Sequence, residues 1–139
     1  MRIMAIDYGD AHTGIAISDP TGFLAGYTTV INAYRPEVVA DQIATLVKEH
    51  GVEELVLGHP INMDGTRGPR SEKAQAMAEL LREATELPVV LWDERRTTID
   101  AHQILMNNGK NAKKRKKTVD AVAASLILEG YLTFKKSRG

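Results

Sequence analysis

Residues 2–18 have the sequence RIMAIDYGDAHTGIAIS, and this stretch decides the fold. Two apolar runs, Ile3–Asp7 and Gly14–Ser18, flank a polar segment with Gly and Asp, which is typical of two strands joined by a short turn. A third run, Tyr27–Ile31, is rich in Thr, Val and Ile and predicts another strand. Because the links between these runs are short, consecutive antiparallel pairing is the economical arrangement.

Beyond residue 35 the apolar residues follow a helical period. Val39, Ile43 and Val47 predict a helix that starts at Pro36 and is capped by Gly51. Further segments alternate between strand and helix patterns. Strands are predicted at 54–58 and 88–92. Helices are predicted around 74–81, from Thr98 to Asn108, and from a cap at Thr118 onward. The order βββαβαβαα predicts an α/β fold, a mixed five-stranded sheet with helices on both faces.

Composition limits the class of protein. The 139 residues suit one domain spanning 1–139, and the absence of cysteine excludes disulfide scaffolds and thiolate metal sites. The longest uncharged run, 20–34, is too short and too polar to cross a bilayer, and Asp7 and Asp10 interrupt any apolar signal core. A soluble, cytoplasmic protein is therefore expected.

The net charge is zero, but acidic and basic residues are distributed unevenly along the chain. Residues 1–108 carry 9 basic and 16 acidic side chains, whereas residues 109–139 carry 9 basic and 2 acidic ones. Six of the eight residues in Lys110–Lys117 are Lys or Arg. This run is either a solvated loop or a contact with nucleic-acid phosphates, and composition does not choose between them.

Acidic residues follow the predicted strands. Asp7 ends the first, and Asp93 and Glu94 follow directly on 88–92, at the carboxyl ends where ligands of such sheets gather. Alternation directs Asp93 and Glu94 to opposite faces. Asp120 lies near the start of the last predicted helix, where the helix dipole alone would explain an acid. Turn capping and pairing with Arg95 and Arg96 are the structural alternatives for the strand-end acids.

Together these carboxylates favour a hard divalent cation. Mg²⁺ takes oxygen ligands, and two such ions activate water and stabilise the leaving oxygen in phosphodiester hydrolysis. The four histidines have no HxH or HExxH spacing, so a zinc site is not expected. The sequence has no Walker A loop or GxGxxG loop.

Five motifs in this order resemble the YqgF family. They are Asp7-Tyr8-Gly9 with Gly14–Asp19, Gly58-x-Pro60-x-Asn62–Thr66, Trp92–Arg95 with Thr97-Thr98, Lys114–Lys117, and Asp120-x-x-Ala123-Ala124. The resemblance covers about residues 3–132. Members of this family are RNase H-like proteins, described as Holliday junction resolvases and as nucleases that mature the 5′ end of pre-16S rRNA.

The resemblance implies a sheet of order 3-2-1-4-5 and a metal-dependent endonuclease that uses Mg²⁺ or Mn²⁺. It implies a carboxylate site made by Asp7, Glu94 and Asp120, with Asp93 as the alternative to Glu94. The expected nucleic-acid contacts are Arg95 and the basic residues Lys113, Lys114, Arg115, Lys116 and Lys117. Many relatives have Arg where this chain has His12, which carries a positive charge only when protonated.

The implied substrate is structured RNA, pre-16S rRNA either free or in a ribosomal particle, and the protein is expected to be a monomer or homodimer. One alternative is a resolvase of four-way DNA junctions, because phosphate contacts carry little information about the sugar. A second is a non-cleaving nucleic-acid-binding factor in transcription. A two-domain sugar-kinase-like phosphotransferase is a weaker third, since one domain cannot close on a nucleotide.

Overall fold

The computed structural model describes residues 1–20, 25–60, 68–93 and 112–138. Its five strands form one sheet of order β3-β2-β1-β4-β5. Their bounds are β1 Arg2–Asp7, β2 His12–Ser18, β3 Ala25–Asn32, β4 Val52–His59 and β5 Val89–Asp93. The first three pair antiparallel, whereas β4 and β5 run parallel to β1, so the predicted order and directions are confirmed.

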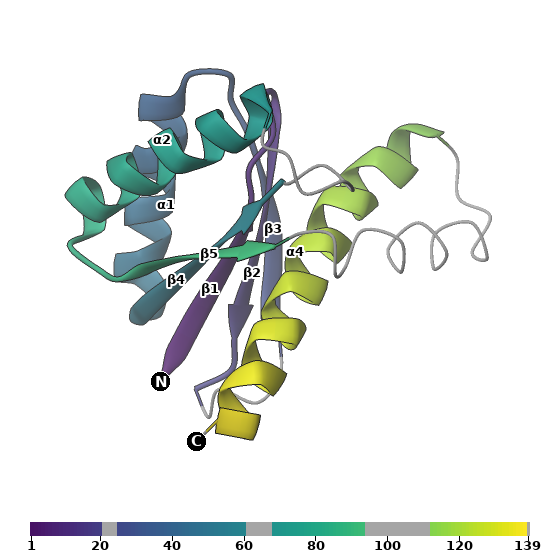
Figure 1. The fold of residues 1–139 in the computed structure, drawn as a ribbon. Helices are drawn as coiled ribbons and strands as arrows, with labels where there is room; N and C mark the ends of the chain where they lie inside the picture. The colour runs from purple at the N-terminus through teal and green to yellow at the C-terminus, as the bar shows by residue number, and fades with distance from the viewer. Residues whose placement is uncertain (21–24, 61–67, 94–111, 139) are drawn as a thin grey trace.

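Helices cover both faces of this sheet, as predicted. Helices α1 (Pro36–His50) and α2 (Pro69–Thr85) lie on one face, and α4 (Ala112–Arg138) crosses the other (Figure 1). The end of α4 lies near the beginning of β1, so its first turns lie toward the edge where β1 ends (Figure 1). Each face has its own apolar core: the larger, under α1 and α2, includes Ile6, Ile43 and Leu57, and the smaller, under α4, includes Ile3, Ala5 and Leu128.

The first helix follows its sequence signals closely. Pro36 lies at its first position, where a missing N–H costs no helical hydrogen bond. Gly51 has a left-handed backbone (φ 66°), and its N–H donates to the carbonyl of Val47. The predicted limits, Pro36 and Gly51, are therefore confirmed.

The start of α4 corrects two predictions. The helix begins at Ala112, six residues before Thr118, so Thr118 is not its cap and Asp120 is not in its first turn. Ala, Lys and Arg are strong helix formers, which explains why the helix extends through the basic run. The run from Ala112 to Lys117 is therefore helical backbone and not a loop. The helix predicted from Thr98 to Asn108 lies outside the described residues.

In the described ranges, no helix is both long enough and apolar enough to cross a membrane.

Candidate active site

Three parallel strands bring acidic and imidazole side chains to one edge of the sheet. Asp7 ends β1, His59 ends β4 and Asp93 ends β5. His59 and Asp93 are register partners, and Ile6 pairs with Leu57, so the three ends are level with one another. The prediction that Asp7 and the Asp93-Glu94 pair share one edge is confirmed for Asp7 and Asp93, while Glu94 and Arg95 lie outside the described residues.

Asp7 and Asp93 belong to opposite faces of the sheet. Alternate residues of a strand face the same side of the sheet, so residues with numbers of the same parity share a face. Along β1, Ile3 and Ala5 face the core under α4, and Asp7 is on the same side. Along β5, Val89 and Leu91 pack on the core under α1 and α2, and Asp93 has their parity. Asp7 thus belongs to the face covered by α4 and Asp93 to the other.

A tight turn follows Asp7. A Cβ atom on Gly9 would lie 2.4 Å from the backbone carbonyl oxygen of His12, so no larger residue fits without moving the turn. His12 Nδ1 lies 2.6 Å from Oδ1 of Asn32, which holds the imidazole at the start of β2. This contact occupies one ring nitrogen of His12.

A buried polar cluster at the end of β4 was not predicted from the sequence. His59 Nε2 lies 2.6 Å from Ser71 Oγ in the first turn of α2, and Gln75 Nε2 donates to the same oxygen at 3.2 Å. Both His59 and Ser71 are buried. Because His59 shares the parity of Leu55 and Leu57, alternation along β4 would have indicated its direction. The cluster fixes the start of α2 to the carboxyl edge of the sheet.

An exposed ion pair connects the turn after β1 to α2. Lys73 Nζ donates to Asp10 Oδ1 at 3.0 Å, which lowers the pKa of the Asp10 carboxyl. Burial raises the pKa of the neighbouring Tyr8 phenol, and the Asp10 carboxylate raises it further. These residues lie on the α2 side of the sheet, away from the face to which Asp7 belongs.

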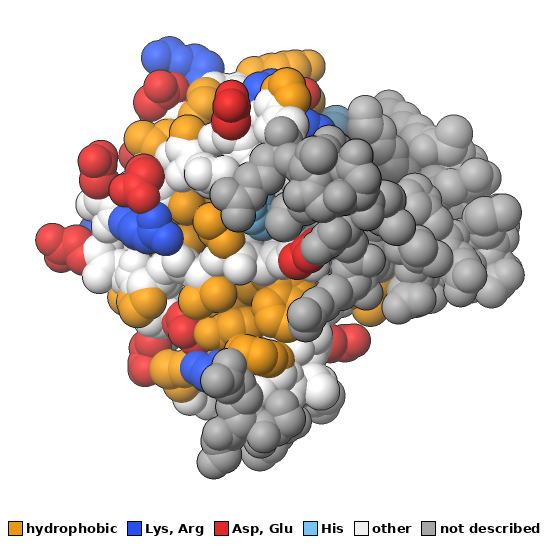
Figure 2. Space-filling view, viewed as in Figure 1, with side chains coloured by type: hydrophobic (Ala, Val, Ile, Leu, Met, Phe, Trp, Pro, Cys, Tyr) orange, Lys and Arg blue, Asp and Glu red, His pale blue; other side chains and the backbone are white. Residues whose placement is uncertain are grey.

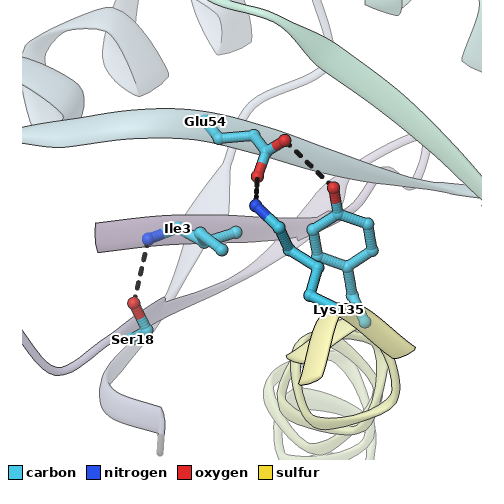
Figure 3. Close-up of polar contacts among 5 residues, drawn as sticks. Ile3, Ser18, Glu54 and Lys135 are labelled. Carbon is cyan, nitrogen blue, oxygen red and sulfur yellow. Dashed lines mark hydrogen bonds and ion pairs between the residues drawn. The ribbon is translucent and has the colours of Figure 1, made fainter. Parts of the chain in front are cut away.

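The second half of α4 is fastened to the sheet at the amino end of β4 (Figure 3). Glu54 accepts hydrogen bonds from the Tyr131 hydroxyl at 3.0 Å and from Lys135 Nζ at 2.9 Å. Burial and the bond to Glu54 raise the pKa of Tyr131 to about 12. Gly130 lies beside Trp92, and a Cβ there would be 3.4 Å from the indole ring, an ordinary van der Waals distance. These contacts set the position of α4 along the sheet.

The remaining predicted site residues lie on α4. The backbone of Asp120 and of Lys113–Lys117 is in this helix, but their side chains are outside the described part of the structure. Among the side chains that are described, no group of three His, Cys, Asp or Glu could hold a metal ion. The chemistry of the donors still suits a hard cation, because Asp7, Glu94 and Asp120 all offer carboxylate oxygens.

Comparison with known sequences identifies close relatives. The model of the RuvX family, described as Holliday junction resolvase, matches residues 1–134. A Halothermothrix orenii protein named "Putative pre-16S rRNA nuclease" is 44% identical over 135 residues, 97% of this chain and 96% of that one. A Bacillus cytotoxicus protein with the same name is 46% identical over 137 residues, 97% of this chain and all of that one.

Solved structures share the architecture at low sequence identity. RuvC of T. thermophilus in complex with Holliday junction substrate aligns with a TM-score of 0.66 and 14% identity, over 99% of this chain and 96% of RuvC. The large terminase nuclease of the thermophilic phage G20c aligns with a TM-score of 0.54 and 12% identity, over 90% and 80% of the two chains. The fold is therefore RNase H-like, as the family resemblance implied.

Proposed function

The chain belongs to the RuvX (YqgF) family, and from this premise we propose that it is a metal-dependent endonuclease that processes the 5′ end of pre-16S rRNA in ribosome biogenesis. The observation that carries the proposal is the position of Asp7, a carboxylate at the carboxyl end of the central strand on the face covered by α4. Residues 1–139 act in this proposal as one nuclease domain in the cytoplasm.

Strand parity supports Glu94 as the second acid. Asp93 has the parity of Leu91, on the face under α1 and α2, so the next residue of a continued strand returns to the face of Trp92 and Asp7. Glu94 therefore suits a site shared with Asp7 better than Asp93 does. Asp93 remains the alternative ligand.

Helical spacing supports Asp120 as the third acid. Position 120 precedes Ala124, Ile127 and Tyr131 by four, seven and eleven residues, and these three are buried against the sheet. Position 120 is therefore on the stripe of α4 that faces the sheet, in the half of the helix toward the edge where β1 ends (Figure 1). Asp7, Glu94 and Asp120 would meet at that edge.

These acids would hold Mg²⁺ or Mn²⁺. Such ions would activate a water and stabilise the leaving oxygen in phosphodiester hydrolysis. The carboxylates would fix the position of the ions at this edge of the sheet, and so the place where the scissile phosphate binds. The cations of Lys113–Lys117, together with Arg95, would bind the backbone of the nucleic acid on either side.

A four-way DNA junction is the alternative substrate, and the description of the family favours it. A junction resolvase cuts two strands symmetrically, so that function requires a homodimer, whereas cleavage of rRNA precursor is compatible with a monomer. A non-cleaving nucleic-acid-binding factor would need the basic run but not three converging acids.

The discriminating experiment incubates purified protein with pre-16S rRNA particles and, separately, with a four-way DNA junction, each with Mg²⁺ or Mn²⁺. We expect cleavage at the 5′ end of the precursor that depends on the metal and is absent in Asp7→Asn. Symmetric cutting of the junction alone would instead assign the resolvase activity. Metal-independent binding without cleavage of either substrate would contradict both nuclease assignments.

A further inference from the structure

A pocket of 640 Å³ lies on the face of the sheet opposite to Asp7, between the turn after β1, the start of α1 and the exposed side of α2. Its size is that of sites that hold a ligand or an anchoring side chain. Eleven residues line it: Tyr8, Asp10, Tyr34, Pro36, Glu37, Lys73, Ala76, Met77, Glu79, Leu80 and Glu83. The proposed nuclease function makes no use of this pocket.

The pocket combines an apolar wall with an acidic rim. Met77 and Leu80 belong to or pack on the core, and Tyr34 is a 79% exposed aromatic ring beside them. Four of the lining residues are acids and one, Lys73, is basic. Lys73 is already paired with Asp10, so the lining carries a net negative charge. Figure 2 shows several Asp and Glu side chains over α2 at the left of the view.

Two acids of the rim lack a strong partner. Glu83 forms no ion pair with another described residue, and Glu37 has only a contact of 3.9 Å with Arg35, whose side chain is 79% exposed. An ion pair that is this exposed and this distant holds its two side chains only weakly. These carboxylates are therefore available to a cation from outside the chain.

This charge excludes nucleic acid as the occupant, because the rim would repel phosphates. A cation beside the ring of Tyr34 would instead gain attraction from the aromatic face and from the carboxylates. The apolar wall favours an occupant that also carries an aliphatic side chain. The rim is open, since the side chains of Glu37 and Glu79 are 65% and 70% exposed, which suits an extended chain lying across it.

We propose that this pocket is a protein-docking site that binds a basic segment of a partner protein, with an Arg or Lys against Tyr34 and the acidic rim and an aliphatic neighbour on the apolar wall. The sheet separates the pocket from the face of Asp7. The proposed docking site and the proposed carboxylate site therefore belong to opposite faces of the sheet.

The test measures fluorescence anisotropy of a short labelled peptide of alternating Arg and Leu at an ionic strength of about 0.15 M. We expect Tyr34→Ala to weaken binding about two- to fivefold, the loss of one cation–π contact. Replacing Glu37, Glu79 and Glu83 by Gln together should weaken it about tenfold. The matched control replaces three exposed acids outside the pocket, with Asp41→Asn, Glu53→Gln and Glu72→Gln, and should leave binding within twofold of the parent.

Other outcomes would overturn the proposal. If the control triple weakens binding as much as the pocket triple, or if a peptide of alternating Arg and Ser binds equally well, the attraction is only net charge. A loss of binding in Asp7→Asn equal to that in Tyr34→Ala would place the peptide at the strand ends. Competition by free spermidine at matched charge would indicate a small cation as the occupant, and self-association lost in Tyr34→Ala would indicate a second copy of this chain.

Discussion

At the scale of single residues, the structure shows whether Asp93 and Asp7 share a face of the sheet, which the sequence alone leaves open. Asp93 belongs to the face under α1 and α2, whereas Asp7 belongs to the face under α4. In the proposed site, the second acid is expected on the same face as Asp7. Glu94 is therefore the stronger candidate, and the two acids are expected to respond differently to substitution.

We predict that Asp7→Asn and Glu94→Gln each reduce cleavage by orders of magnitude, because each removes a charged oxygen ligand while keeping the shape of the side chain. Asp93→Asn should leave most of the activity. The measurement is the single-turnover rate of cleavage at saturating Mg²⁺.

The control for these variants is the melting temperature without metal. It should hold or rise in Asp7→Asn, since clustered carboxylates repel each other. Full cleavage by Asp7→Asn would refute the catalytic assignment. Full cleavage by Glu94→Gln together with loss in Asp93→Asn would transfer the second role to Asp93.

The sequence predicted the position of Asp7 because a charge directly after an apolar run marks the end of a buried strand. It did not predict the burial of His59 against Ser71, because that contact joins residues on two elements and depends on how α2 packs. Nor did the sequence reveal the pocket beside Tyr34, whose wall forms only when α1 and α2 lie side by side on the sheet.

At the scale of elements, the two halves of α4 differ in character. Its second half carries the buried residues that pack on the sheet, and its first turns carry the basic run. The sequence predicted a helix here but placed its start at Thr118. A solvated loop and a helix of Lys and Arg have the same composition, so charge alone did not locate the boundary.

We predict that replacing Lys113, Lys114, Arg115, Lys116 and Lys117 by Ala weakens nucleic-acid binding and flattens its dependence on salt. Alanine preserves the helix, so the effect isolates charge. Each lost phosphate contact should reduce the log–log slope by roughly 0.7–0.9. Binding titrations between about 0.05 and 0.2 M salt give the slope, and an unchanged slope would mean that the run does not touch phosphate.

The contact of Tyr131 with Glu54 predicts a loss of stability at high pH. The folded protein raises the pKa of Tyr131 from 10.0 to about 12, so between these values the folded state holds a proton that the unfolded state releases. The stabilisation of the folded state by the protonated Tyr131 hydroxyl is complete below about pH 10 and is lost as the pH rises toward 12. Urea unfolding across this range should show a shallower decline for Tyr131→Phe than for the parent, and identical slopes would contradict the assignment.

At the scale of the whole molecule, α4 is the only helix of the described ranges that covers its face of the sheet. The order and directions of the strands were predictable, since short links dictate the antiparallel strands and the intervening helices dictate the parallel ones. The long reach of α4 was not, because its contacts with Glu54 join residues separated by 77 and 81 positions.

We predict that Leu128→Ala lowers the free energy of unfolding by about 2–5 kcal/mol, because Leu128 is fully buried between α4 and the sheet. The exposed neighbour provides the control, and Glu129→Ala should change the free energy of unfolding by no more than about 0.5 kcal/mol. Urea unfolding followed by circular dichroism measures both. Equal effects of the two substitutions would contradict the packing of α4 on this face.

The position of α4 late in the chain also has a consequence for biosynthesis. A ribosome that has made β1 to β5 has exposed the apolar face that α4 covers, and at about 5–20 residues per second α4 follows only seconds later. Asp120 is the last of the three proposed acids to be synthesised, so a chain that ends before Asp120 has no complete carboxylate set. Because burial of the nascent face and assembly of the proposed site depend on the same helix, the proposed cleavage would begin only after that helix has been synthesised.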